Sequence, residues 1–238
     1  PPPPSAVTPE PIVALDVPTT KAALALVDRL GDACGFYKVG LELFTAEGPR
    51  AVVALRERGA DVFLDLKLHD IPNTVAGAAR SAARLGVRLL TVHGSGGAAM
   101  VRAAVDGAGE ACGILAVTLL TSLDAPSAAA AWGRETLDVQ TEVLRLAGVA
   151  ESAGAAGIVC SGAEAGAVRD RFGARVATLV PGVRPAGAPA QDQARVVTPA
   201  GAAAAGARWI VLGRAVTGAA DPEAALAAIR GELAASPA

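Results

Sequence analysis

Short apolar runs alternate along the chain with longer alanine-rich stretches that carry arginine and glutamate. The eight apolar runs, rich in β-branched residues, cover residues 12–17, 35–40, 61–67, 88–93, 113–120, 157–160, 175–180 and 208–213. Continuously apolar strands separated by helices are typical of a parallel sheet whose outer side is covered by those helices. The pattern therefore predicts eight parallel strands.

The stretches between the strands show helical periodicity and commonly end at glycine, a frequent helix terminator. The clearest of them cover residues 20–30, 48–59, 75–86 and 136–154. Eight strand–helix units in a chain of 238 residues most economically close into a (β/α)₈ TIM barrel, an α/β fold. An open dinucleotide-binding sheet is disfavoured, because residues 15–20 read LDVPTT instead of a Gly-x-Gly-x-x-Gly turn.

We expect a single barrel domain over residues 11–236, preceded by a disordered proline-rich leader at residues 1–10. The leader lacks the basic start and apolar stretch of a signal peptide, and no apolar run reaches the roughly 18 residues of a membrane span. The sequence therefore indicates a cytoplasmic protein.

Composition restricts the kind of partner. A formal net charge of −2 provides no general attraction to nucleic acid or to an anionic membrane, so we expect a small-molecule partner at a local site. Cys34, Cys112 and Cys160 are widely spaced without a CxxC pair, and we interpret them as buried thiols. With only His69 and His93 in the chain, a histidine-rich metal site is excluded.

Polar residues gather where the predicted strands end. In a TIM barrel the active site is assembled from the carboxyl ends of the strands and the loops that follow them. The residues at these positions are Asp16, Lys38, Asp65, Lys67, His93, Thr118, Thr121, Ser122, Arg184, Gly213 and Arg214. Of the two histidines, His93 is the one expected to line this rim, although a purely structural histidine is the safer interpretation.

The third strand has a charged face. Its end reads FLDLKLHDIPNT, and period-two alternation places Phe63, Asp65 and Lys67 on one side. An ordinary ion pair is one interpretation, although desolvation makes a buried pair a poor source of stability. Lys38 on the neighbouring strand favours a chain of alternating charges instead, which can hold a lysine protonated and aimed.

A second cluster at the rim is suited to an anion. Gly213 and Arg214 end the eighth strand just before a helix, and Arg184 and Gln193 belong to the loop after the seventh strand. Loops seven and eight frequently form a phosphate site in TIM barrels. Solvated surface arginines are the alternative, but the positions favour a small phosphate ester as the ligand.

These motifs together point to a family. The segments DLKLHDIPNT, GFYKVGLELF, LTVHGSGG, AVTLLTSLD, PGVRP and VLGRAVT resemble the orotidine 5′-phosphate decarboxylase family, from about Ile12 to the C-terminal helix. The resemblance implies a homodimeric carboxy-lyase of de novo pyrimidine biosynthesis. Such an enzyme removes the C6 carboxylate of orotidine 5′-phosphate (OMP) to give UMP and CO₂, with no metal or organic cofactor.

The resemblance also implies roles for the charged residues. Lys67 would protonate C6 as CO₂ leaves, and Asp65 would lie beside the substrate carboxylate, where like-charge repulsion raises the ground state. Asp70 would cross the dimer interface into the partner's site and complete a network with Lys38, Asp65 and Lys67. In this resemblance Asp16 and Lys38 would contact the ribose, the partner would supply Thr74, and Thr121 would lie near the pyrimidine. Arg184, Gln193, Gly213 and Arg214 would bind the phosphate. The full set of implied substrate-binding residues is Asp16, Lys38, Asp65, Ile71, Thr74, Thr121, Arg184, Gln193, Gly213 and Arg214.

Two alternatives remain open from the residues. Mg²⁺-dependent sugar-phosphate decarboxylases and aldolases of the same barrel superfamily share a DxKxxD pattern, but they typically follow it with Ala-Gly, whereas this chain continues with IPNT. A non-catalytic phosphate-binding barrel would have no need for Asp65, Lys67 and Asp70 together.

Overall fold

The computed structural model describes residues 8–185 and 196–235. Residues 1–7 of the expected leader, and the expected phosphate ligand Gln193, lie outside the described residues. Glu10, expected to end the leader, is instead the first residue of the first strand.

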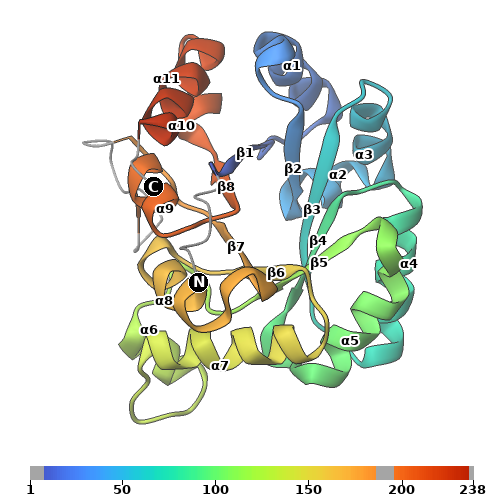
Figure 1. Cartoon of the computed structure of the whole chain (residues 1–238). Helices are drawn as coiled ribbons and strands as arrows, with labels where there is room; N and C mark the ends of the chain where they lie inside the picture. Colours follow the sequence, from blue (N-terminus) through green and yellow to red (C-terminus); the bar gives the residue numbers. More distant parts are fainter. Residues whose placement is uncertain (1–7, 186–195, 236–238) are drawn as a thin grey trace.

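Eight parallel strands form a closed barrel (Figure 1). They are β1 (Glu10–Ala14), β2 (Phe36–Gly40), β3 (Asp61–Leu68), β4 (Leu89–His93), β5 (Gly113–Val117), β6 (Gly157–Val159), β7 (Ala177–Val180) and β8 (Trp209–Leu212). Each strand pairs with the next in sequence, and β8 pairs back onto β1, for example Val13 opposite Leu212. The predicted (β/α)₈ TIM barrel is confirmed.

Helices surround the barrel and follow the strands in sequence (Figure 1). They are α1 (Thr20–Leu30), α2 (Leu41–Glu47), α3 (Pro49–Arg56), α4 (Pro72–Arg84), α5 (Gly97–Ala108), α6 (Ala125–Ala131), α7 (Val139–Ser152), α8 (Gly162–Phe172), α9 (Pro199–Ala204), α10 (Arg214–Thr217) and α11 (Pro222–Ala234). Side-chain caps fix several starts: Asp138 accepts from the Thr141 N–H, and Ser161 and Glu164 form a capping box. No helix in the described part of the chain has the length and apolar character needed to cross a membrane.

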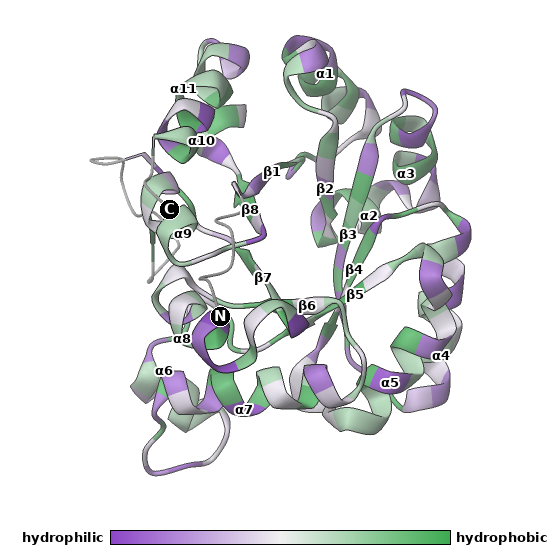
Figure 2. Cartoon of the chain, in the orientation of Figure 1, coloured by the Kyte–Doolittle hydropathy of each residue, from purple (hydrophilic) through white to green (hydrophobic). Residues whose placement is uncertain are grey.

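Alternation along the strands divides the apolar side chains into two cores. The smaller lies inside the barrel and consists of Ile12, Ala14, Phe36, Phe63, Leu89, Leu115, Leu179, Trp209 and Val211. The larger lies between the strands and the helices, which present their apolar faces inward (Figure 2). The barrel interior is thus filled with apolar side chains below its carboxyl end, which is the end where this fold assembles its active site.

The fifth strand is shorter than its hydropathy predicts. The expectation of residues 113–120 is wrong at its end, because β5 stops at Val117. Thr118 and Leu119 are nonetheless buried, and the N–H and hydroxyl of Thr118 both donate to the Val159 carbonyl on β6. The apolar run at residues 113–120 therefore indicates which residues are buried, and it extends beyond the last residue of the strand.

Candidate active site

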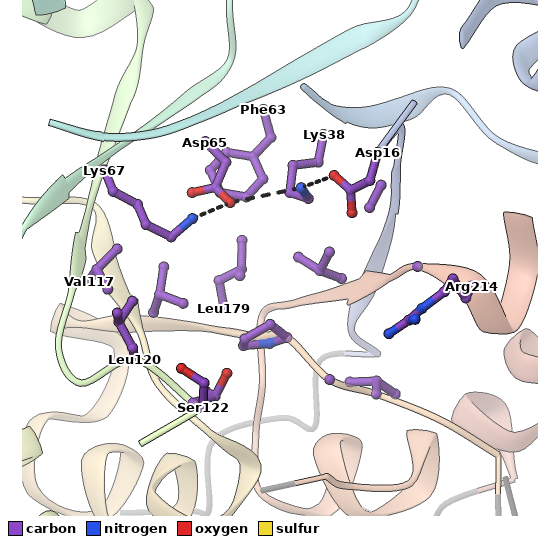
Figure 3. Close-up of a pocket in the computed structure, with 18 of the residues that line it drawn as sticks. Asp16, Lys38, Phe63, Asp65, Lys67, Val117, Leu120, Ser122, Leu179 and Arg214 are labelled. Atoms are coloured by element: carbon purple, nitrogen blue, oxygen red, sulfur yellow. Dashed lines mark hydrogen bonds and ion pairs between the residues drawn. The ribbon is translucent and has the colours of Figure 1, made fainter. Parts of the chain in front are cut away.

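A cavity of about 610 Å³ opens at the carboxyl ends of the strands (Figure 3). It is within the size range of small-molecule sites. Eight of the residues expected to bind or act on a substrate line it together: Asp16, Lys38, Asp65, Lys67, Thr121, Arg184, Gly213 and Arg214. The barrel thus brings together side chains that are separated by almost 200 positions in the sequence.

Four charged side chains form a chain of alternating sign along one wall of the cavity (Figure 3). Lys67 Nζ lies 2.8 Å from Asp65 Oδ2, Lys38 Nζ lies 3.9 Å from the same oxygen, and Lys38 Nζ lies 2.7 Å from Asp16 Oδ1. The side chains of Lys38 and Asp65 are 11% and 14% exposed, whereas Asp16 is 56% exposed. The inner charges are therefore poorly solvated and interact strongly, and the predicted alternation of Lys38, Asp65 and Lys67 is present.

Glycine at position 40 leaves room for this arrangement. A Cβ atom at Gly40 would lie 2.9 Å from Lys38 Nζ and 3.3 Å from Asp16 Oδ1. Contacts that short would displace the ammonium group from its carboxylate partners. The end of β2 thus supplies the lysine and the space in which its head group lies.

The end of β3 departs from regular strand geometry. Lys67 has a φ of +50°, and it is the only non-glycine residue with a positive φ among the described residues. Such a backbone costs roughly 1–2 kcal/mol for an L-residue and is often found at functional sites. The β3–β4 register also shifts between Leu64 and Leu68. Simple alternation therefore fails at Lys67, although its side chain still reaches the cavity beside Asp65.

A threonine that sequence analysis did not single out contacts both catalytic candidates. Thr91 Oγ1, on β4, lies 2.9 Å from the backbone nitrogen of Lys67 and 2.9 Å from Asp65 Oδ1. Thr91 is fully buried and is absent from the cavity lining. Period two counted back from His93 places Thr91 on the inner face of its strand, a signal that could have identified it.

Two arginines, Arg184 and Arg214, also line the cavity. Arg214 lies across the cavity from Lys67 (Figure 3), and Gly213 stands immediately before α10. Arg184 is anchored through its backbone N–H, which donates to the Val197 carbonyl at 3.0 Å. A ligand that spans the cavity from Lys67 to Arg214 would thus meet a lysine–carboxylate pair at one end and a guanidinium group at the other.

The two histidines lie next to each other at one side of the site. Their ring centroids are 5.3 Å apart, and the rings are inclined by 42°. Burial lowers the pKa of His93, as do the charges of His69 and Lys67, while Asp65 acts in the opposite direction. His93 does not line the cavity, so the expectation that it forms part of the rim is wrong.

Three of the expected residues lie outside this chain's own cavity. Asp70, Ile71 and Thr74 are exposed between the end of β3 and the first turn of α4, and Ile71 is 66% exposed. The Asp70 carboxylate accepts a hydrogen bond from the Ile71 N–H at 2.6 Å. Among the described residues it makes no ion pair with Lys67, whose ammonium group is paired with Asp65.

Comparison with known proteins identifies the family of this chain. A family model described as "Orotidine 5'-phosphate decarboxylase / HUMPS family" matches residues 9–229. An orotidine 5′-phosphate decarboxylase of Anaeromyxobacter sp. (strain K) is 57% identical over 220 residues, which cover 92% of this chain and 96% of that protein. One from Moorella thermoacetica is 50% identical over 230 residues, covering 93% and 91%.

Solved structures show the same relationship. The crystal structure of orotidine 5′-phosphate decarboxylase from Lactobacillus acidophilus superposes with a TM-score of 0.83 at 38% identity, covering 94% of this chain and 98% of that chain. The enzyme from Pyrococcus horikoshii OT3 gives 0.75 at 27% identity, covering 94% and 99%. With the barrel, the charged cavity and the relatives in agreement, this chain belongs to the orotidine 5′-phosphate decarboxylase / HUMPS family.

Proposed function

We propose that this protein is an orotidine 5′-phosphate decarboxylase that converts OMP into UMP and CO₂ in pyrimidine biosynthesis. The observation that carries the proposal is the Lys67–Asp65 pair, 2.8 Å apart in a cavity that Arg184 and Arg214 also line, with Arg214 across the cavity from Lys67 (Figure 3). A nucleotide with a carboxylated base and a 5′-phosphate matches this separation of charges. The relatives named above carry the same activity in their names.

The decarboxylation requires an atom that retains the bonding electron pair and a donor that supplies a proton to that atom. The bond between C6 and its carboxylate breaks, the electron pair stays on C6, and Lys67 Nζ donates a proton to that carbon. Asp65 lies beside the departing carboxylate, where the repulsion of like charges is relieved as neutral CO₂ forms. The same carboxylate holds the Lys67 ammonium group in position, so that proton donor and reacting carbon meet with little reorganisation.

Binding at the distant phosphate supports the reaction. We assign Arg184, Gly213 and Arg214 to the phosphate, together with Gln193, which lies outside the described residues. Asp16 and Lys38 are assigned to the ribose hydroxyls, and Thr121 to the pyrimidine. Energy gained from such remote contacts can be used in the transition state, so these residues should affect turnover as well as affinity.

The assignment of Lys67 is tested by removing its ammonium group. In Lys67→Ala we expect kcat to fall by at least about 10²-fold, because a positioned general acid contributes on that scale or above. The loss of OMP absorbance measures the rate, and calorimetric titration with UMP should show that the product still binds. Lys21→Ala is the matched control, since Lys21 is exposed on α1, away from the cavity. A Lys67→Ala enzyme with the turnover of the Lys21→Ala enzyme would contradict the proposal.

The same assay separates this function from its nearest alternative. A sugar-phosphate decarboxylase or aldolase of this superfamily would need Mg²⁺ to stabilise an enediolate. We therefore expect OMP to be consumed at an unchanged rate in EDTA. Turnover of a sugar phosphate that EDTA abolishes, with OMP left intact, would favour the alternative.

We further propose that the active enzyme is a homodimer in which Asp70, Ile71 and Thr74 complete the partner's site. The exposure of all three beside the chain's own cavity supports this arrangement, as does the absence of a contact between Asp70 and Lys67 within the described chain. Each site would then need two chains.

Mixing of variants tests the shared site. Lys67→Ala and Asp70→Ala homodimers should each be nearly inactive, whereas a mixed dimer has one site with both groups intact. After subunit exchange, statistical mixing should restore up to about a quarter of the wild-type activity per chain, since half of the dimers are mixed and each has one intact site. Exchange is verified by mass spectrometry of differently tagged chains, and no recovery after verified exchange would contradict the shared site.

Two further assignments complete the proposal. Residues 11–236 act as one barrel domain, which the continuous circuit from β1 to β8 supports. We place the enzyme in the cytoplasm, in keeping with its expected nucleotide substrate, and cell fractionation tests this location.

A further inference from the structure

In the wall of the active-site cavity, three residues of β3 stand opposite a single residue of β4. The register pairs Leu64 with Leu90 and Leu68 with Val92, which leaves residues 65–67 facing Thr91. A bulge of this kind takes backbone groups out of the ladder between strands. The Lys67 N–H donates instead to the side-chain oxygen of Thr91, 2.9 Å away. The threonine side chain thus replaces a ladder contact where Lys67 adopts its left-handed backbone.

The direction of the second hydrogen bond follows from the first. A backbone N–H can only donate, so Thr91 Oγ1 accepts from Lys67. A hydroxyl has one hydrogen, and that hydrogen is left for Asp65 Oδ1 at 2.9 Å, because a carboxylate can only accept. One hydroxyl therefore connects the backbone of the proposed proton donor to the side chain of the neighbouring carboxylate.

This connection divides the two oxygens of Asp65 between separate tasks. Oδ1 accepts from Thr91, while Oδ2 faces the ammonium groups of Lys67 at 2.8 Å and Lys38 at 3.9 Å. Without the hydroxyl, the carboxylate could rotate about its χ2 torsion, which is broad for aspartate. The Lys67 N–H would also be left without its partner in the bulge.

We propose that Thr91 is a positioning residue that aligns Asp65 and Lys67 for proton transfer to the substrate. Thr91 is fully buried and is absent from the cavity lining, so it acts through the two residues it holds. The inference rests on the proposed function, because the step that it supports is the protonation by Lys67.

The test removes the hydroxyl and keeps the shape. In Thr91→Val we expect kcat for OMP to fall about tenfold to a hundredfold, the scale expected when a hydrogen bond to a charged group is lost. The Kd for UMP should change by less than about threefold, because the contacts assigned to ribose and phosphate remain. Thr91→Ser, which keeps the hydroxyl, should retain kcat to within about threefold of the wild type.

Thr178→Val is the matched control. Thr178 is a buried threonine on β7 whose hydroxyl has no hydrogen-bond partner among the described residues. The Thr178→Val enzyme should have the same kcat as the wild type. The positioning role would be overturned if kcat fell equally in Thr91→Val and Thr91→Ser. It would also be overturned if Thr91→Val had the same kcat as Thr178→Val.

A structural readout keeps this test separate from the proposed function. Crystal structures of Thr91→Val and wild-type protein should show a rotated Asp65 carboxylate and a changed Lys67 backbone in the variant only. If the wild type fails to decarboxylate OMP, the proposed function is refuted, and the crystal structures still decide whether Thr91 positions the pair. An unchanged Asp65–Lys67 geometry in the variant would overturn the inference.

Discussion

Lys67 combines a residue type that is rare in this chain with a backbone conformation that is rare for it. The chain has only three lysines among its 21 basic residues, and Lys67 is the described non-glycine residue with a left-handed backbone. Glycine would adopt that backbone at lower cost, but it has no side chain to carry a proton. Under the proposed function, the strain at this position is tolerated because the proton donor must be a lysine, and the hydrogen bond from the Lys67 N–H to Thr91 helps to hold the backbone there.

His93 provides a prediction about pH at the same scale. Burial, together with the charges of His69 and Lys67, lowers its pKa below the ordinary value of 6.5. As the pH falls below 6.5, the unfolded chain therefore binds this proton before the folded chain does, and folded-state stability declines. The decline should be complete once the pH passes the lowered pKa of the folded state.

Replacing His93 should flatten that part of the stability curve. His93→Phe keeps an aromatic ring against His69 and cannot bind a proton. Urea unfolding of both proteins between about pH 5 and pH 8 measures the difference, and the stability at pH 8 serves as the reference at which His93 is neutral. If wild type and His93→Phe lose equal stability between pH 6.5 and pH 5, the assigned direction of the pKa shift is wrong.

At the scale of elements, hydrophobic patterning predicted what depends on burial alone. Each of the eight apolar runs overlaps one of the eight strands, and the expected helix at residues 20–30 matches α1 in both bounds. The charged wall could also be predicted, since Asp16, Lys38 and Asp65 lie toward the carboxyl ends of apolar runs, and these ends must meet in a barrel. These features need only periodicity and topology.

The β3 bulge could not be predicted in this way. In the sequence, the two-residue alternation of β3 continues through Asp65 and Lys67. The register of β3 on β4, in contrast, depends on which backbone and side-chain atoms form hydrogen bonds in the folded protein. The hydrogen bonds of Thr91 follow from that register, so they could not be predicted either, although alternation does place Thr91 on the inner face of β4. His93 was misplaced because the strand end alone does not determine whether its side chain turns toward the cavity or toward His69.

At the scale of the whole molecule, the end of the barrel opposite the cavity is closed by ionic contacts. Arg88, just before β4, makes two hydrogen bonds of 2.8 Å to the Glu10 carboxylate and one of 3.1 Å to Asp61. Its guanidinium also lies 4.6 Å from the centre of the Phe36 ring, and the Trp209 indole donates to Glu10 at 3.1 Å. The pKa of Arg88 is raised, with the hydrogen bonds to Glu10 as the largest cause. These contacts connect the starts of five strands around the barrel.

Removing this guanidinium should separate stability from activity. Arg88→Met keeps an apolar stem of similar length and removes the bonds to Glu10 and Asp61. Arg88 is 34% exposed and its carboxylate partners slightly more, so solvent weakens these bonds, and we expect a loss of about 1–2 kcal/mol in the free energy of unfolding. Urea unfolding at one fixed protein concentration measures the loss, because stability depends on concentration in a dimer.

The kinetic constants of the same variant should stay within about twofold of wild type, because catalysis in this fold takes place at the other end of the strands. Arg208→Met is the control at the same end: Arg208 lies 5.8 Å from the Trp209 ring and makes no ion pair among the described residues, so its loss should stay below about 1 kcal/mol. Equal destabilisation by the two changes would mean that loss of an arginine, whatever its partners, determines the effect. A large fall in kcat for Arg88→Met would instead mean that the closed end of the barrel controls the geometry of Lys67 and Asp65, and the two ends could no longer be treated as independent.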